Sequence, residues 1–298
     1  MSKNLGELSG RKGLKTNLFE ALGIAAADTG APSVERMETL AGEFLMGKAN
    51  IFGTASFYDF LKEDNKGKKV FVCNGSACMT AGTQEALKEK LRYEFNAGEI
   101  GEMCCLGRCH ENSAFNYDGK NYSGNAVDEI EAIKTERSKP ADTYHVAAHG
   151  TPVLTEAFTH VNEYYKILAA ALSQSPEALL AELKDSGLRG RGGAGFPISF
   201  KLDSCRNSPG NQKFIVCNAD EGDPGAYSDR YLMEQQPHSV LLGMMIAGYI
   251  VGADAGVLYI RAEYPESQEI IQDAINHLLD ENLLGENILG SGFNFNFK

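Results

Sequence analysis

Apolar residues in the first part of the chain recur at helical spacing. Between residues 17 and 60 many of them fall three or four positions apart, as Leu18 and Leu22 do, and Met37, Leu40 and Phe44, with Ile24 and Leu45 nearby. This spacing places them on one face of an amphipathic helix. The pattern predicts a small helical bundle over residues 1–65.

The pattern changes to short strands after residue 65. Lys69 to Cys73 is a β-branched and aromatic run typical of a strand, and residues 82–95 carry leucines at helical spacing. Two short runs, 114–117 and 120–122, flank Asp118-Gly119, a dipeptide that favours a hairpin turn. Strand, helix and hairpin in this order predict a small α/β domain over residues 66–135.

Residues 136–154 are polar and irregular, which predicts a linker. The elements expected after it are a helix at 176–185, a glycine-rich turn at 187–195, a strand at 213–217, an acidic turn at 218–229, an apolar helix around Leu242, a strand at 256–260 and a helix at 267–284. Alternating strands and helices indicate a second α/β domain, over residues 155–298, with some parallel sheet.

The negative net charge of the chain disfavours some classes of binding partner. There are 28 Lys and Arg against 40 Asp and Glu, a net charge of −12, which repels nucleic acid and anionic lipid headgroups. The apolar run 240–253 is shorter than the ~20 residues that span a bilayer, and the first residues do not resemble a secretory signal. We therefore expect a cytoplasmic protein that neither binds nucleic acid nor inserts into a membrane.

Five of the seven cysteines lie between residues 73 and 109. Cys73 and Cys78 form C-x4-C, Cys105 and Cys109 form C-x3-C, and 26 residues separate the pairs. Four thiolates suit either an iron–sulfur cluster or zinc. Gly75 and Gly107 favour the cluster because they let backbone amides donate to its sulfurs. The alternative is a zinc-stabilised interaction protein.

Other potential ligands are weaker candidates. Cys104 competes with Cys105, since neighbouring side chains of an extended segment point in opposite directions. His110 follows Cys109, but a Rieske centre needs two histidines, so we interpret it as a loop side chain. His145 and His149 stand in the expected linker without a third ligand nearby, which disfavours a metal site there.

The glycine-rich turn contains Gly190, Gly192 and Gly195 in the spacing G-x-G-x-x-G. A Rossmann fold requires a strand before this motif, whereas a helix is expected here. The motif can still bind a phosphate, because glycines let backbone amides approach it closely. Arg191 and Lys201 add positive charge nearby. A tight turn with solvated arginines is the alternative.

The acidic turn begins where an apolar strand ends. It holds Asn218, Asp220, Glu221, Asp223 and Asp229, and strand ends are where α/β folds place ligands. Such side chains can accept hydrogen bonds from ribityl or ribose hydroxyls and from flavin or nicotinamide amides. A calcium-like or merely solvated loop is the alternative.

The first half resembles a known family. Cys73-Asn-Gly-Ser-Ala-Cys78, Cys105-Leu-Gly-Arg-Cys109 and the upstream Phe52-Gly-Thr-Ala-Ser-Phe-Tyr58 are similar to the thioredoxin-like [2Fe-2S] ferredoxin that forms the 24-kDa-type subunit of complex I. The resemblance implies a helical bundle followed by a ferredoxin domain. It also implies that the cluster ligands are Cys73, Cys78, Cys105 and Cys109, with Cys105 preferred over Cys104 because the family's loop starts there.

The second half resembles the 51-kDa-type flavoprotein subunit of complex I, which also serves as the diaphorase of NAD-linked hydrogenases and formate dehydrogenases. The residues that carry the resemblance are 186–197, Lys201, 218–225 and 259–265. It implies the first part of a complex I flavoprotein-type α/β domain. The residues that would hold FMN are Gly190, Arg191, Gly192, Gly193 and Lys201, with Asn218, Asp220 and Glu221 at the flavin and Phe196 and Asp223 at the nicotinamide nucleotide.

Three positions depart from that family. Asp223 stands where a glutamate is usual, Ala262 replaces a frequent glycine, and no aromatic residue follows Lys201; these changes affect the expected NAD(H) site more than the FMN site. The chain also ends at Lys298, before the family's later segments. We therefore expect a complete flavin pocket to need residues beyond those present.

Together the two resemblances imply an electron-input subunit. Hydride would pass between NAD(H) and FMN, and single electrons would pass through iron–sulfur centres to other iron–sulfur and catalytic subunits of a redox complex. No side chain is expected to act as acid or base in this transfer. The alternative is a non-catalytic [2Fe-2S] electron-transfer or scaffold subunit without a complete flavin site.

Overall fold

The structure is a computed structural model that describes residues 16–27, 30–138, 144–156, 161, 165–191, 193–223, 225–261 and 263–297. The chain forms two compact units. The first comprises residues 1–144 together with two short segments from later in the chain, 222–227 and 263–265. The second comprises 145–221, 228–262 and 266–298. The expectation of mixed α/β architecture is confirmed.

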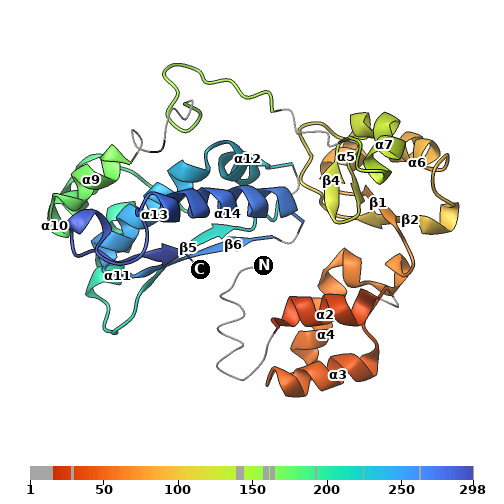
Figure 1. Cartoon of the computed structure of the whole chain (residues 1–298), viewed down its shortest axis with the longest axis horizontal. Helices are drawn as coiled ribbons and strands as arrows, with labels where there is room; N and C mark the ends of the chain where they lie inside the picture. The colour runs from red at the N-terminus through yellow and green to blue at the C-terminus, as the bar shows by residue number, and fades with distance from the viewer. Residues whose placement is uncertain are drawn as a thin grey trace. The chain divides into compact units, whose positions relative to one another are not determined.

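In the described part of the first unit, the first helices are α2 (Leu18–Ala27), α3 (Val34–Glu43) and α4 (Lys48–Phe57) (Figure 1). The Ser33 side chain caps α3 by accepting a hydrogen bond from the Arg36 amide at 3.2 Å. Leu22, Leu40 and Ile51 are fully buried in the core that these helices share. The apolar spacing seen in the sequence therefore corresponds to a helical bundle, as expected.

The rest of the first unit is built on a four-stranded sheet of order β2-β1-β3-β4. Its strands are β1 (Val70–Cys73), β2 (Ile100–Met103), β3 (Phe115–Tyr117) and β4 (Lys120–Tyr122). β1 pairs in parallel with β2 and antiparallel with β3. The β3–β4 hairpin turns at Asp118 and Gly119, both at positive φ (50° and 74°), as an Asp-Gly turn requires.

The edge strand β2 was not among the elements expected from the sequence. Its four residues, Ile-Gly-Glu-Met, carry little strand signal. The Asn65 side chain holds its outer side: its Nδ2 donates to the Glu102 carbonyl at 2.9 Å, and its Oδ1 accepts from the Glu102 amide at 3.4 Å. A Cβ on Gly101 would lie 2.6 Å from that Oδ1, so glycine is needed for this contact.

Helices α5 (Ser76–Ala81), α6 (Gln84–Leu91) and α7 (Ile130–Lys134) accompany this sheet. Leu87 and Leu91 of α6 pack against Val70, Val72 and Phe115 of the strands. The sequence predicted a single helix over 82–95, and the separate helix α5 was missed. It is short, and it ends at Gly82 in the left-handed conformation (φ 67°).

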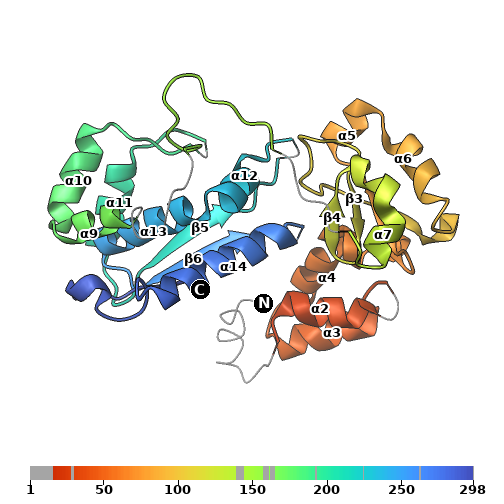
Figure 2. The ribbon, with the colours of Figure 1, turned by 45° about the horizontal axis from the view of Figure 1, so that its top comes forward.

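The second unit has a parallel sheet of order β5-β6-β7, made of β5 (Phe214–Ala219), β6 (Ala255–Ile260) and β7 (Asn296–Phe297). Its helices are α9 (Lys166–Leu172), α10 (Pro176–Asp185), α11 (Ile198–Asn207), α12 (Ser228–Gln235), α13 (Pro237–Val251) and α14 (Pro265–Asp280). Figures 1 and 2 show α13 and α14 running alongside the sheet. The predicted parallel sheet and helices α10, α13 and α14 are present, whereas α11 and α12 were not predicted.

The core of this unit lies between the helices and one face of the sheet. Leu241 and Met245 of α13, Leu278 of α14 and Phe295 are fully buried. The apolar run expected to be a buried helix is α13, which has eight buried residues. Within the described residues, no helix combines the length and the apolar character needed to cross a bilayer.

A buried histidine in this core makes stability depend on pH. Burial, followed by repulsion from the nearby His277, lowers the pKa of His238 to about 4. Its ring lies beside the Tyr165 hydroxyl, 3.4 Å from Nδ1. Because the folded-state pKa lies below the ordinary value of 6.5, the neutral form stabilises the fold above pH 6.5, and this contribution is lost as pH falls toward 4.

We therefore expect the unfolding free energy of the wild type to fall by about 1–3 kcal/mol more than that of His238→Gln between pH 7 and pH 4.5. Urea unfolding followed by circular dichroism across this range measures the difference. Parallel pH profiles for the two proteins would contradict the assignment.

Candidate functional site

The two cysteine motifs meet because of the pairing of β1 with β2. Cys73 is the last residue of β1 and lies in register with Met103 at the end of β2. Parallel strands end at the same edge of a sheet, so the loops that leave β1 and β2 start side by side. Cys78 lies in α5, directly after the first loop, and Cys105 and Cys109 lie in the second.

The structure brings these four predicted residues together. Cys73, Cys78 and Cys105 are buried, and Cys109 is half-buried. The Sγ atoms of Cys105 and Cys109 are 3.3 Å apart, and the Cys73 thiol is in hydrogen-bond contact with the thiols of Cys105 and Cys78. Cys104 is exposed, and its amide donates to Asp59 Oδ2 at 2.6 Å.

Backbone amides surround the sulfurs. The amides of Gly75 and Gly107 lie 3.4 Å from the Sγ atoms of Cys73 and Cys105, respectively, the two glycines singled out in the sequence. A third amide, that of Gly225, lies 3.2 Å from Cys109 Sγ. Sequence reasoning missed Gly225, which is 116 residues away along the chain but belongs to the same unit.

Hydrogen bonds between these thiols shift their pKa values in opposite directions. The bond from Cys73 lowers the pKa of Cys78 to about 6, with help from the backbone of Ala114 and Ser113. Hydrogen bonds with Cys105 and Cys78, together with burial, raise the pKa of Cys73. The lowered pKa favours the thiolate form of Cys78, which is the form that binds metals.

These residues fit an iron–sulfur cluster better than a single ion. A Cβ on Gly75 would lie 3.4 Å from both Cys73 Sγ and Cys105 Sγ, so glycine leaves room where the two loops meet. Four thiols with convergent amide donors are the donor set of a [2Fe-2S] cluster.

The glycine-rich segment is a loop closed at its base. The Gly190 amide donates to the Phe196 carbonyl at 2.9 Å, and the Ile198 amide donates to the Leu188 carbonyl at 3.1 Å. Arg189 Nη1 donates to the Gly195 carbonyl at 2.8 Å. Within the described residues, the amides of 191, 193 and 194 donate to no backbone carbonyl, so they can receive a phosphate.

The remaining predicted residues of this loop are exposed. Arg191, Gly193, Phe196 and Lys201 are accessible, and Lys201 lies in α11, which opens directly after the loop; Gly192 is outside the described residues. A cavity of about 510 Å³ lies beside the base of the loop. Its lining combines apolar side chains with three charged ones: Leu180, Ala181, Leu183, Lys184, Gly187, Leu188, Arg189, Pro197, Ser199, Phe200 and Asp203.

The acidic turn starts at the end of β5, as the sequence indicated. Asn218 pairs in register with Tyr259 of β6, and its Oδ1 accepts from the Asp220 amide at 3.4 Å. Asp220 is half-buried, and Asp223 is exposed and belongs to the first unit.

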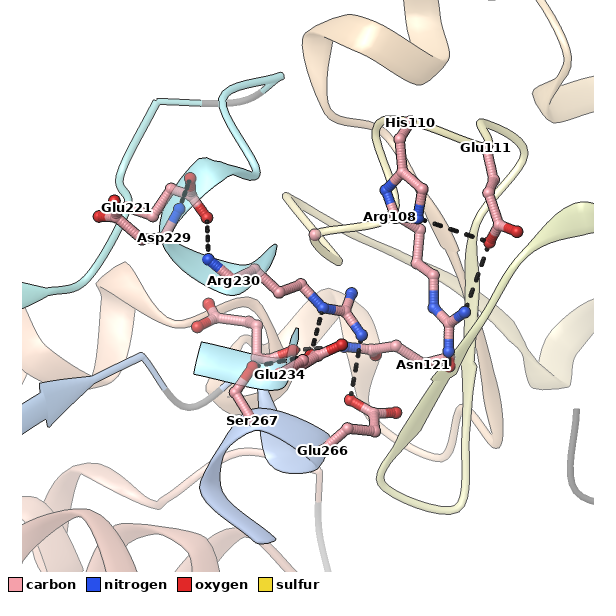
Figure 3. Close-up of polar contacts among 12 residues, drawn as sticks. Arg108, His110, Glu111, Asn121, Glu221, Asp229, Arg230, Glu234, Glu266 and Ser267 are labelled. Carbon is pink, nitrogen blue, oxygen red and sulfur yellow. Dashed lines mark hydrogen bonds and ion pairs between the residues drawn. The ribbon is translucent and has the colours of Figure 1, made fainter. Parts of the chain in front are cut away.

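The Glu221 carboxylate caps α12. It accepts hydrogen bonds from the Asp229 amide at 2.8 Å and the Arg230 amide at 3.1 Å (Figure 3), and a carboxylate at a helix N-terminus is favourable. Burial, followed by repulsion from Glu221, raises the pKa of Asp229. Because this carboxylate already accepts two helix amides, Glu221 could contact a flavin only through its backbone or while its carboxylate also caps α12.

A buried ion-pair network continues from this cap. Arg230 is fully buried; its Nε lies 2.7 Å from Glu234 Oε1, and its Nη2 lies 3.5 Å from Glu266 Oε2 (Figure 3). The Ser267 hydroxyl donates to Glu234 at 2.8 Å. The network ties α12 to the start of α14. The i,i+4 spacing of Arg230 and Glu234 was the available sequence signal.

Two separate stretches of the chain match known protein families. Residues 7–136 match the thioredoxin-like [2Fe-2S] ferredoxin, and residues 183–288 match the Nuo51 FMN-binding domain.

Individual proteins show the same relationship. Subunit HndC of the NADP-reducing hydrogenase of Solidesulfovibrio fructosivorans is 48% identical over 134 residues, 45% of this chain and 27% of that protein. Subunit alpha of the NAD-reducing hydrogenase HoxS of Cupriavidus necator is 32% identical over 277 residues, 82% of this chain and 46% of that protein. The chain thus spans less than half the length of these relatives.

A solved structure agrees with both halves. The NAD+-reducing [NiFe]-hydrogenase in the air-oxidized state superposes with a TM-score of 0.69 and 25% identity, over 94% of this chain and 50% of that chain.

The buried network allows a stability test. Arg230→Met leaves the Glu234 carboxylate buried beside an apolar side chain, so we expect a loss of about 3–5 kcal/mol in unfolding free energy. Arg230→Met combined with Glu234→Leu removes both charges and should recover most of that loss. Urea unfolding measures both variants; equal destabilisation by the single and double variants would contradict a charge effect.

Proposed function

Because this chain joins a stretch that matches the thioredoxin-like [2Fe-2S] ferredoxin to one that matches the Nuo51 FMN-binding domain, we propose that it is the electron-input part of a redox enzyme. It exchanges electrons with NAD(H) and passes them singly to other subunits. The observation that carries the proposal is the convergence of four thiols at one sheet edge, in a chain that continues into a flavin-type domain.

We assign the cluster ligands as Cys73, Cys78, Cys105 and Cys109. The burial of three of these thiols and the sulfur contacts among all four support the assignment. The amides of Gly75, Gly107 and Gly225 would donate to the ligand sulfurs and favour the reduced cluster, because hydrogen bonds to the sulfurs offset added negative charge.

We assign the phosphate of FMN to the loop 190–195. The open amides of residues 191, 193 and 194 would donate to it, and the Lys201 ammonium would balance its charge. Asn218, Asp220 and the segment at Glu221 would accept hydrogen bonds from the flavin and its ribityl chain.

We assign the nicotinamide nucleotide to Phe196 and Asp223. Phe196 is 49% exposed, which leaves its ring accessible for stacking, and Asp223 would accept from a ribose hydroxyl. When bound, FMN would supply two-electron exchange with NAD(H) and one-electron exchange with the cluster. The side chains bind and orient these groups and transfer no proton themselves.

The relatives' names support the rest of the proposal. One is a subunit of an NADP-reducing hydrogenase and another of an NAD-reducing hydrogenase, so the partners would be iron–sulfur and catalytic subunits of a similar complex. We further propose a cytoplasmic location, in keeping with the net charge of −12.

The cluster assignment is tested by serine substitution. We expect the purified chain to contain iron and acid-labile sulfide in equal amounts and to absorb visible light. Cys105→Ser should lose most of the iron and absorbance, whereas Cys104→Ser, the neighbouring exposed control, should keep them. Zinc in place of iron, or equal loss in both variants, would reject the assignment.

The flavin assignment is tested by Lys201→Met. Removing a charge-assisted hydrogen bond worth about 1.5–3 kcal/mol should weaken FMN binding about 10- to 100-fold. Lys166→Met, a surface change on α9 of the same unit, serves as the control. Fluorescence titration with FMN measures both. A chain that holds iron but binds no FMN would favour the non-catalytic electron-transfer alternative.

A further inference from the structure

Arg108 is a buried charge inside the ligand loop. It stands between Gly107 and Cys109, and only 4% of it is exposed. Burying a guanidinium is costly unless it is paired and hydrogen-bonded. A buried cation at this position therefore requires an explanation.

The Arg108 side chain contacts a carboxylate and a backbone carbonyl. Its Nη1 lies 3.4 Å from Glu111 Oε2, and its Nη2 donates to the carbonyl of Asn121 (Figure 3). The Arg108 carbonyl accepts from the Glu111 amide at 3.1 Å and the Asn112 amide at 3.0 Å. This turn folds Glu111 back against Arg108.

The surroundings keep this pair away from water. Asn121 is 1% exposed, and the Glu111 side chain is 13% exposed. The His110 ring stacks on Tyr144 with centroids 4.5 Å apart and lies 4.9 Å from Tyr227. The Tyr264 ring packs on Gly107, where a Cβ would lie 2.2 Å from its Cε1. Charges in such a low-dielectric setting act on one another more strongly than on a surface.

We propose that the charges of Arg108 and Glu111 shift the reduction potential of the [2Fe-2S] cluster in opposite directions. The inference rests on the proposed ligation by the four cysteines. Reduction adds one electron to a centre that four thiolates already make negative, so a nearby cation favours the reduced form and a nearby anion opposes it. Arg108 lies between the ligands Cys105 and Cys109, and Glu111 lies two residues after Cys109. Each charge would therefore act on the same centre, with opposite sign.

Neutralising Arg108 and neutralising Glu111 should shift the midpoint potential of the cluster in opposite directions. Arg108→Gln removes a positive charge and should lower the midpoint potential of the cluster, whereas Glu111→Gln removes a negative charge and should raise it. The double variant should return toward the wild-type value, and Arg108→Lys should stay near it. Redox titration of the purified chain, followed by the electron paramagnetic resonance of the reduced cluster, measures all four.

A matched pair on the surface serves as control. Lys90 and Asp128 form a 2.7 Å ion pair in the same unit, with side chains 52% and 70% exposed. Lys90→Gln and Asp128→Asn change the same charges, but solvent and salt screen them. Neither should move the potential measurably.

The outcomes separate the inference from the proposed function. Shifts of the same sign in Arg108→Gln and Glu111→Gln, or no shift in either, would overturn the inference while leaving the cluster assignment intact. If Arg108→Gln fails to fold, the direction of the Glu111→Gln shift decides. A wild-type chain without iron would overturn the proposed function itself and this inference with it.

Discussion

The parallel pairing of β1 with β2 is the contact on which the candidate cluster site depends. It aligns Cys73 with Met103, so the two cysteine loops leave the sheet from one edge. β2 has weak strand propensity, and the Asn65 side chain supports its outer side through two hydrogen bonds to Glu102. Loss of this pairing would separate the loops and leave the four thiols without a common centre.

Each unit buries an arginine next to its candidate site. Arg108 is held by Glu111 and the Asn121 carbonyl in the ligand loop, and Arg230 is held by Glu234 at the start of the helix that Glu221 caps. Buried ion pairs add little net stability compared with apolar packing, but breaking one is costly. In both places the pair fixes the geometry of a segment proposed to bind a redox group.

Much of the site could be predicted from the sequence because its signals are local. The cysteine spacing, the Asp118-Gly119 hairpin and the glycine-rich loop each depend on neighbouring residues. Contacts between distant segments could not be predicted. The Gly225 amide at Cys109 and the Tyr264 ring on Gly107 come from segments more than 100 residues away. Helix α12 was missed as well, because its charged sequence has a short apolar face.

The sequence alone determined which residue types are available and how most elements form. Helical spacing in the first 60 residues, a hairpin turn, alternating strands and helices, and two cysteine pairs follow from side-chain chemistry and period. Only the tertiary structure decided that Cys105 points inward while Cys104 is exposed, that Glu221 serves a helix end, and that Arg108 is buried. The burial of a side chain and the groups it contacts depend on residues that folding brings close together. The spacing of residues along the chain does not show which residues these are.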